Sequence, residues 1–166
     1  MATTAAKRSS KVDVDLMFLL SQASHALETE LTARLQALGV SPRAHCVLTH
    51  ALRGGELTQS QVAEQCALDK TTMVVTMDEL ERAGLAERRA SSTDRRARII
   101  AVTKAGEKIV AEADAIVAGI YGEVLAALPA AQRDAFVAGL AQLVGGRLST
   151  PMKCERPVRR RAVRAA

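Results

Sequence analysis

Residues 57–107 read LTQSQVAEQCALDKTTMVVTMDELERAGLAERRASSTDRRARIIAVTKAGE, and this segment determines the architecture of the chain. Thr58 and Gln61 have the spacing of a capping box, which predicts the start of a short helix. Asp69 can cap a second helix, and Gly84 is a natural stop for it. The segment therefore predicts two helices joined by a short turn.

A basic hairpin is expected directly after the helix pair. Residues 85–90 and 98–102 suit two short antiparallel strands, and residues 82–104 carry seven Lys and Arg against two acidic residues. Such a charge run is usually a solvated surface, but positive charges packed at a hairpin tip repel each other unless a polyanion faces them. A helix-turn-helix followed by a hairpin presents the second helix to the DNA major groove and the hairpin to the minor groove. The combination favours DNA binding.

Long helices are predicted on both sides of this module. Apolar residues recur every three or four positions from residue 13 to Leu38, and Ser41-Pro42 opens the next helix. After the hairpin, a helix capped by Thr103 runs to Pro129, and a last helix covers about 130–147. The apolar faces of these helices exceed what a small module can cover, which favours a two-fold dimer interface. Packing within one chain is the alternative.

The predicted fold class is mainly α, a winged helix-turn-helix with flanking long helices forming a dimerisation domain. The expected parts are a disordered basic N-terminus (1–11), N-terminal helices for dimerisation and a pocket (12–53), the DNA-binding domain (54–103), C-terminal dimerisation helices (104–148) and a disordered basic tail (149–166).

Composition restricts the class of protein further. The 166 residues carry a net charge of +5, with no Trp, one Tyr and two Phe, and the alanine-rich composition suits close-packed helices. Three scattered cysteines indicate a reducing compartment, and no secretory signal or membrane helix is evident, so a cytoplasmic protein is expected. The chain contains no phosphate-binding loop and no hydrolase, metalloprotease or dinucleotide motif, so we predict neither an enzyme nor a cofactor.

The segment resembles the winged helix-turn-helix of the multiple antibiotic resistance regulator (MarR) family. The shared marks are "LT…S…A" in the first helix, "LDKTT" opening the second, "D-x-LE-x-x-GL" ending it, then "ERR", "DRRA" and "VTKAG". The flanking helices agree in number and order, so the resemblance covers about residues 13–147.

This resemblance implies a dimeric bacterial transcription regulator that binds a pseudo-palindromic operator, mostly as a repressor, and often releases DNA on binding a phenolic or other anionic ligand. It implies a phosphate contact for Lys70, and base and phosphate contacts for Thr71 and Thr72. Asp94, Arg95 and Arg96 match the wing signature, in which an arginine enters the minor groove.

The chain departs from the family in the second helix. Many relatives read roughly S-T-V-T-R where this chain reads T-T-M-V-V, so Val74 and Val75 replace threonine and arginine. Helical geometry places both valines opposite the predicted core side, and they could touch thymine methyl groups. Packing against Ala51 or Leu52 is the alternative. The predicted DNA-binding residues are Lys70, Thr71, Thr72, Val74, Val75, Arg82, Asp94, Arg95, Arg96 and Arg98.

The resemblance implies an effector pocket between the dimer helices and the winged domain. Its candidate residues are His25, Arg43, His45 and His50, since a cation and imidazoles beside an apolar wall suit an aromatic carboxylate. A surface arginine with packed histidines is the alternative.

A zinc-responsive or thiol-responsive regulator of the same fold is a further alternative. His45 and His50 are five residues apart and poorly placed for one ion, so no metal site is predicted. Cys46 and Cys66 are expected to be buried and inert, and Cys154 lies in the tail. A low-specificity architectural DNA-binding protein that uses its basic tail is the remaining alternative.

Overall fold

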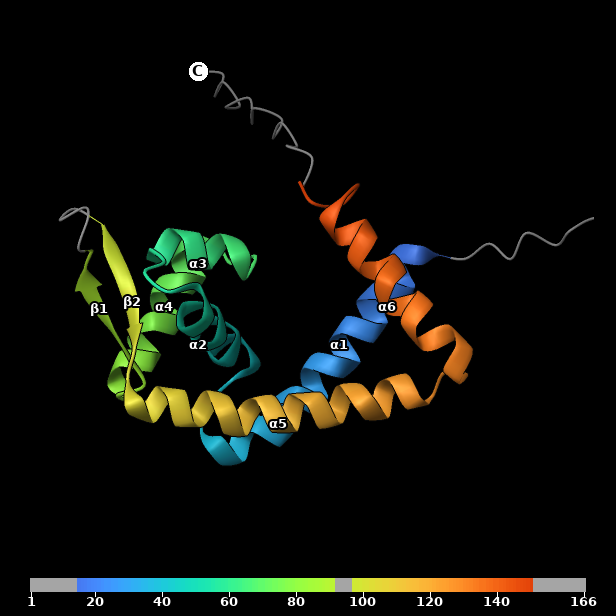
Figure 1. The fold of residues 1–166 in the computed structure, drawn as a ribbon, viewed down its shortest axis with the longest axis horizontal. Coiled ribbons are helices and arrows are strands. Elements are labelled where there is room, and N and C mark those ends of the chain that lie inside the picture. Colours follow the sequence, from blue (N-terminus) through green and yellow to red (C-terminus); the bar gives the residue numbers. More distant parts are fainter. Residues whose placement is uncertain (1–14, 92–96, 151–166) are drawn as a thin grey trace, which may run out of the picture. The chain divides into compact units, whose positions relative to one another are not determined.

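The computed structural model describes residues 15–91 and 97–150. The predicted disordered N-terminus, most of the predicted tail and the wing tip lie outside these ranges. The chain divides into two compact units, Met1–Ile120 and Tyr121–Ala166, which are treated separately below. In chain order the elements are α1 (Leu16–Leu35), η1 (Gln36–Leu38), α2 (Pro42–Gly54), α3 (Gln59–Gln65), α4 (Lys70–Arg82), β1 (Ala86–Ala90), β2 (Arg98–Val102), α5 (Lys104–Ala126) and α6 (Ala130–Gly145) (Figure 1).

The predicted helix starts are confirmed by their caps. The backbone N–H of Gln61 donates to Oγ1 of Thr58 at 3.2 Å, and the Thr58 N–H donates back to Oε1 of Gln61 at 2.8 Å. Oδ1 of Asp69 accepts from the first turn of α4, and Oγ of Ser41 accepts from the first turn of α2. Local side-chain chemistry therefore sets where α2, α3 and α4 begin.

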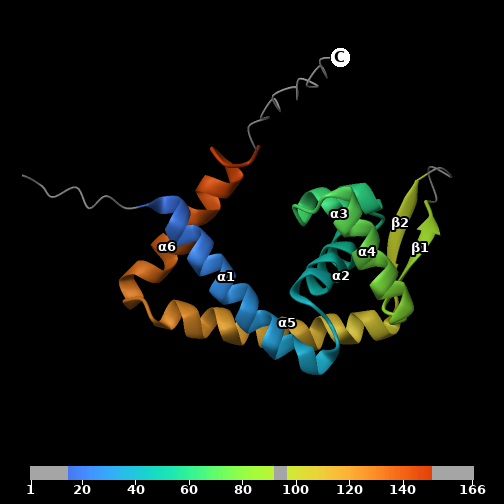
Figure 2. The same ribbon diagram turned by 180° about the vertical axis from the view of Figure 1, so that it is seen from behind.

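The core of the first unit lies where α2, α3, α4, the hairpin and the start of α5 meet. Figure 2 shows α2, α3 and α4 gathered beside the two strands. Each helix contributes one apolar face, as the 3.6-residue period requires. The fully buried side chains include Leu35, Val47, Leu48, Val62, Met73, Met77, Leu80 and Ile100.

The hairpin is a two-stranded antiparallel sheet whose register runs from Ala86 opposite Val102 to Ala90 opposite Arg98. Its base is held against the helices, because the Ile100 N–H donates to the Leu57 carbonyl at 3.2 Å. A Cβ atom on Gly106 would lie 2.1 Å from the Leu85 carbonyl oxygen, so only glycine permits α5 to start this close to the hairpin.

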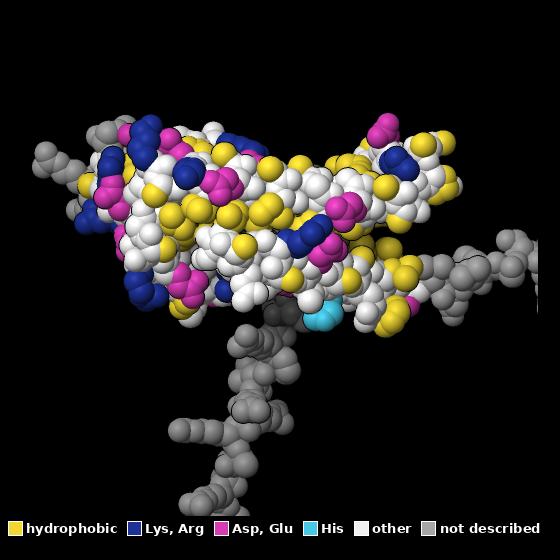
Figure 3. Space-filling view, turned by 90° about the horizontal axis from the view of Figure 1, so that it is seen from below, with side chains coloured by type: hydrophobic (Ala, Val, Ile, Leu, Met, Phe, Trp, Pro, Cys, Tyr) yellow, Lys and Arg dark blue, Asp and Glu magenta, His cyan; other side chains and the backbone are white. Residues whose placement is uncertain are grey.

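The terminal helices have apolar side chains at the surface. In α1, Leu31 and Leu35 are buried, but the first turn is exposed at Leu16, Met17, Phe18 and Leu19. In the second unit, α6 has no buried residue, and Phe136, Val137, Leu140, Leu143 and Val144 are all exposed. Figure 3 shows hydrophobic side chains at the surface of the face that carries α5. Each unit taken by itself therefore has an exposed apolar helix face.

Across the described residues, no helix has both the length and the apolar character needed to span a bilayer.

Candidate nucleic-acid interface and neighbouring sites

Helix α4 has one buried face and one exposed face. Met73, Thr76, Met77 and Leu80 are buried. Thr71, Val74, Val75, Asp78 and Arg82 are exposed on the other side, as the helical period predicted. Val74 is 38% and Val75 48% exposed, so both valines remain accessible at the surface. The second helix of the pair thus presents a mixed apolar and polar face to solvent.

The start of α4 is organised by the carboxylate of Asp69. Oδ1 accepts the backbone N–H groups of Thr71 and Thr72 at 2.9 and 3.0 Å, and Oγ1 of Thr72 donates to Oδ2 at 2.6 Å. The Thr72 hydroxyl bond is the main reason why the pKa of the Asp69 carboxyl lies below its usual value. The hydroxyl proton of Thr72 is therefore used in the cap, whereas the Thr71 side chain is exposed.

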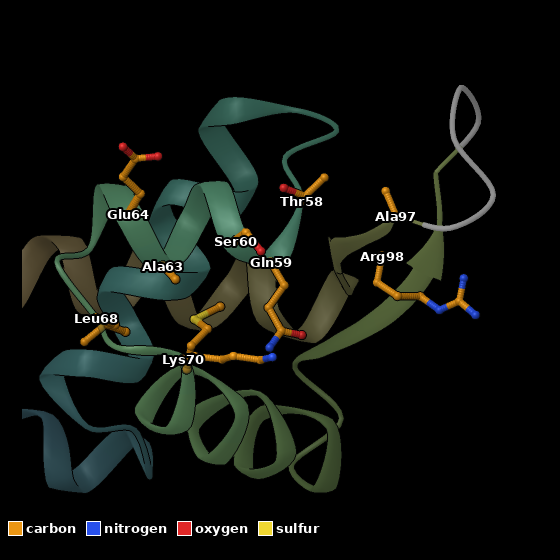
Figure 4. A pocket seen from close by; sticks show the side chains of 10 residues that line it. Thr58, Gln59, Ser60, Ala63, Glu64, Leu68, Lys70, Ala97 and Arg98 are labelled. Atoms are coloured by element: carbon orange, nitrogen blue, oxygen red, sulfur yellow. The ribbon is translucent and has the colours of Figure 1, made fainter.

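A hollow of about 830 Å³ lies between α3, α4 and the tip end of β2, with both acidic and basic residues on its wall. In Figure 4, the side chains of Gln59 and Lys70 extend toward one another from α3 and α4, and Arg98 projects from β2. The lining residues are Thr58, Gln59, Ser60, Ala63, Glu64, Leu68, Lys70, Met73, Ala97 and Arg98. Hydroxyl, amide and ammonium donors in a concave surface suit a phosphate backbone.

Arg88 contributes to the structure of the wing. Its guanidinium donates to Oδ1 of Asp78 at 2.7 Å, to Oε1 of Gln59 at 3.1 Å and also to Glu81. These bonds join β1 to α3 and α4, so most of the Arg88 charge is neutralised inside the protein. Arg89 is exposed and pairs with Glu87 on the same strand. The sequence alone predicts that this charge faces an external polyanion, and for Arg88 the prediction is wrong because its partners lie on α3 and α4.

Of the four predicted wing residues, Arg98 is within the described part of the chain. Asp94, Arg95 and Arg96 lie outside the described residues. Arg98 is the first residue of β2 and is exposed.

Of the predicted effector residues, Arg43 lines a pocket of about 300 Å³ between α1 and α2. The other lining residues are Ser24, Leu27, Glu28, Leu31, Pro42, Cys46, Cys66 and Leu68. His25 is exposed on α1, and its backbone carbonyl accepts from Thr29. This pocket therefore places Arg43 beside an apolar wall, and its lining residues include none of the three histidines.

The other two histidines face different partners. Nε2 of His45 lies 2.8 Å from Oδ1 of Asp114 on α5, and Oδ2 of Asp114 accepts from Arg53 at 2.7 Å. Nδ1 of His50 lies 3.0 Å from Oε1 of Gln65 at the end of α3. The structure does not gather the four predicted residues into one cluster.

A cluster that sequence reasoning missed involves both described cysteines. The side-chain donor atoms of Cys46, His50 and Cys66 all lie within 4.8 Å of one another. The two sulfurs are 3.3 Å apart, and both residues are half-buried, so the expectation of fully buried thiols is wrong. The four-residue spacing of Cys46 and His50 on one helix was the available signal.

The two thiols have opposite acidities. The hydrogen bond between the Cys46 and Cys66 sulfurs, helped by the charge of His50, lowers the pKa of Cys46 to about 6 although partial burial opposes the shift. The same sulfur pair raises the pKa of Cys66, because its proton is held by its neighbour. Cys46 is therefore the thiol that ionises near neutral pH.

Comparisons with known proteins agree with this geometry. The sequence model of the MarR family matches residues 38–97. CouR from Rhodococcus jostii RHA1, crystallised with p-coumaroyl-CoA, is 27% identical over 89% of this chain and 100% of its own, with a TM-score of 0.72. The Mycobacterium tuberculosis MarR family protein Rv2887, crystallised with p-aminosalicylic acid, is 26% identical over 78% of this chain and 98% of its own, with a TM-score of 0.65. MepR of S. aureus, crystallised with DNA, is 20% identical over 80% and 98%, with a TM-score of 0.71.

The helix pair, the two-stranded wing and the flanking helices define a winged helix-turn-helix protein. The MarR family model matches this module over residues 38–97, and the whole chain resembles solved transcriptional regulators of that family. The resemblance inferred from the sequence is thereby confirmed.

Proposed function

We propose that the protein is a transcriptional repressor that binds a pseudo-palindromic operator as a homodimer. The observation that carries this proposal is the exposed face of α4 beside the hollow that Lys70 and Arg98 line. In this arrangement α4 enters the major groove, the hollow receives the DNA backbone, and the wing reaches the neighbouring minor groove. Such a regulator acts in the bacterial cytoplasm on chromosomal DNA.

Direct sequence readout by α4 relies on few polar side chains. Val74 and Val75 cannot form hydrogen bonds to guanine, but their methyl groups fit against the methyl groups of thymine. Thr71 and Arg82 supply the polar contacts on the same face. We therefore expect thymine at the positions beneath the valines, with much of the affinity coming from Lys70 and from Arg95, Arg96 and Arg98 in the wing.

The apolar terminal helices support the homodimer. Phe136 is 54% exposed in the second unit, and the first turn of α1 is exposed in the first unit. A second copy of the chain would cover such faces, and a two-fold dimer would match the symmetry of a palindromic operator.

Fluorescence anisotropy with a duplex from the chain's own upstream region, compared with a scrambled duplex over a salt series, tests the proposal. We expect a specificity ratio of about 10³ or more. Equal affinity for both duplexes, with a steep salt dependence, would favour the low-specificity architectural alternative. The same result with duplexes from neighbouring promoters would reject the site-specific repressor.

The pocket beside Arg43 supports a small aromatic carboxylate as effector. Its volume of about 300 Å³ suits a single ring, and the Arg43 guanidinium can pair with a carboxylate. We expect salicylate-like acids to raise the melting temperature and to weaken operator binding. Arg43→Gln should remove both effects, whereas His25→Gln, on the exposed surface of α1, should leave them intact. Unchanged melting and operator affinity at saturating ligand would contradict the effector proposal.

A further inference from the structure

The cluster of Cys46, His50 and Cys66 has the chemistry and the spacing of a metal-ligand set. One thiol and the imidazole come from α2 and the other thiol from the C-terminal cap of α3, and their donor atoms lie within 4.8 Å of one another. A tetrahedral zinc ion with Zn–S distances of about 2.3 Å places two sulfurs roughly 3.7 Å apart. The observed separation of 3.3 Å needs only a small side-chain adjustment to reach this value.

Gln65 orients the imidazole for such a role. Nδ1 of His50 lies 3.0 Å from Oε1 of Gln65, and with this oxygen as the acceptor Nδ1 carries the ring proton. Nε2 then keeps its lone pair and is available to bind a metal ion. Histidine ligands in proteins commonly donate their other N–H to an oxygen in this way, which fixes the tautomer and the ring orientation.

The surroundings leave room for a bound ion. Both cysteines are half-buried and line the 300 Å³ pocket between α1 and α2, so an ion can enter from solvent and keep one coordination position for water or another small ligand. A disulfide between the two sulfurs would use neither the imidazole nor its hydrogen bond to Gln65. The third donor is the feature that favours a metal over a simple thiol pair.

We propose that Cys46, His50 and Cys66 bind a thiophilic metal ion, Zn²⁺ or Cu⁺, in a three-ligand site between α2 and the end of α3. Thiolate and imidazole donors select these ions over Mg²⁺ or Ca²⁺.

An ion at this site would tie α2 to the turn of the helix-turn-helix. Cys66 is the C-terminal cap of α3, and Ala67 has a left-handed backbone with φ of 52° before α4 begins. A change in operator affinity on metal binding is the expected consequence, and this consequence alone rests on the proposed function.

Cobalt titration of the full-length, reduced and metal-stripped protein tests the site directly. Every variant carries Cys154→Ser so that the tail thiol cannot contribute. We expect one Co²⁺ per chain, with a sulfur-to-cobalt charge-transfer band that Zn²⁺ abolishes by displacement, and Cu⁺ competition in a second arm identifies which ion binds more tightly. Cys46→Ser and Cys66→Ser should each weaken the band strongly.

Two further variants separate the ligands from their surroundings. His50→Gln should keep the charge-transfer band but change the visible cobalt spectrum, and Gln65→Ala should weaken metal binding about tenfold or more. His25→Gln, on the exposed surface of α1, is the matched control and should bind like the parent. Circular dichroism shows that each variant is folded.

The proposal is overturned if folded, reduced protein gives no charge-transfer band, or if the band persists in both cysteine variants. It is also overturned if the reduced protein binds no metal while air oxidation joins Cys46 to Cys66, with the loss of two hydrogens in the mass spectrum. A cobalt band without any effect on DNA would support the site and reject only its regulatory consequence.

Discussion

The winged module and the terminal helices differ in how much of their apolar surface is buried within one chain. In the winged module, Met73, Met77 and Leu80 are buried, and the starts of α3 and α4 are capped by their own side chains. In α6 none of the residues is buried, although the helix is as apolar as a core helix. The module is complete as a folded unit, whereas the terminal helices have the composition of an interface.

This difference in burial suggests that the two parts have different roles. A capped and packed module can hold the exposed face of α4 rigid against DNA. Apolar helices that remain uncovered gain stability only when another surface covers them, at about 25 cal/mol per Å² of apolar area. Assembly, rather than folding of one chain, is therefore where we expect the terminal helices to act.

The largest effect is expected from charge on the apolar face of α6. Leu140→Asp should convert the dimer to a monomer and reduce operator affinity by about 10²- to 10⁴-fold, because two linked half-site contacts become one. Gln142→Asp adds the same charge to an exposed polar position of α6 and is the control. Light scattering measures the oligomeric state, and fluorescence anisotropy measures the operator affinity. A dimer that survives Leu140→Asp would place the interface elsewhere.

A smaller effect is expected inside the winged module. The Arg88 side chain is only 23% exposed and joins Asp78, Glu81 and Gln59, so Arg88→Ala should lower the free energy of unfolding by about 1–3 kcal/mol. Arg89→Ala removes an exposed arginine from the same strand and should change stability by less than about 0.5 kcal/mol. Urea unfolding compares the pair, and equal losses would contradict the assigned role of Arg88.

Variants that lose a contact to the DNA backbone should differ from variants that lose a contact to the bases in how their operator affinity depends on salt. Lys70→Ala, Arg95→Ala or Arg96→Ala should weaken binding similarly on all sequences and reduce the salt slope by about one unit each. Val75→Ala should leave the salt slope unchanged and reduce the preference for thymine beneath α4. An unchanged slope in the arginine variants would reject their contact with DNA.

The smallest effect concerns the cap of α4. The pKa of the Asp69 carboxyl in the folded protein lies below its usual value. The cap therefore stabilises the fold at pH values above the pKa of Asp69 in the unfolded chain, and this stabilisation is lost as the pH falls through its pKa in the folded protein. Thr72→Val removes the hydroxyl donor and should raise the Asp69 pKa toward its usual value. Thr71→Val is the control, since Thr71 contributes only its backbone N–H. NMR titration of the Asp69 carboxyl measures the shift, and equal shifts in both variants would contradict this cause.

Local chemistry explains why much of the fold could be predicted. The capping box at Thr58, the cap at Asp69 and the apolar period of α4 depend on neighbours within four residues, and the structure confirms all three. The MarR resemblance also depended on a contiguous motif. The exposure of Val74 and Val75 followed from helical geometry alone.

Long-range contacts explain what could not be predicted. Cys46 and Cys66 are 20 residues apart, and His45 and Asp114 are 69 apart, so only the packing of α2 against α3 and α5 brings each pair together. Arg88 looked like surface charge because its partners on α3 and α4 are not its sequence neighbours. The positions of Asp94, Arg95 and Arg96 in the wing tip stay predictions.

Selection of bound sequences from a random pool of duplexes tests whether a homodimer reads its operator through α4. We expect enrichment of one two-fold symmetric site, with half-site centres one helical turn of about 10 base pairs apart or a multiple of it. Thymines should recur beneath the valines of α4. A pool that yields no common motif, or a single half-site without symmetry, would contradict a homodimer that reads its operator through α4.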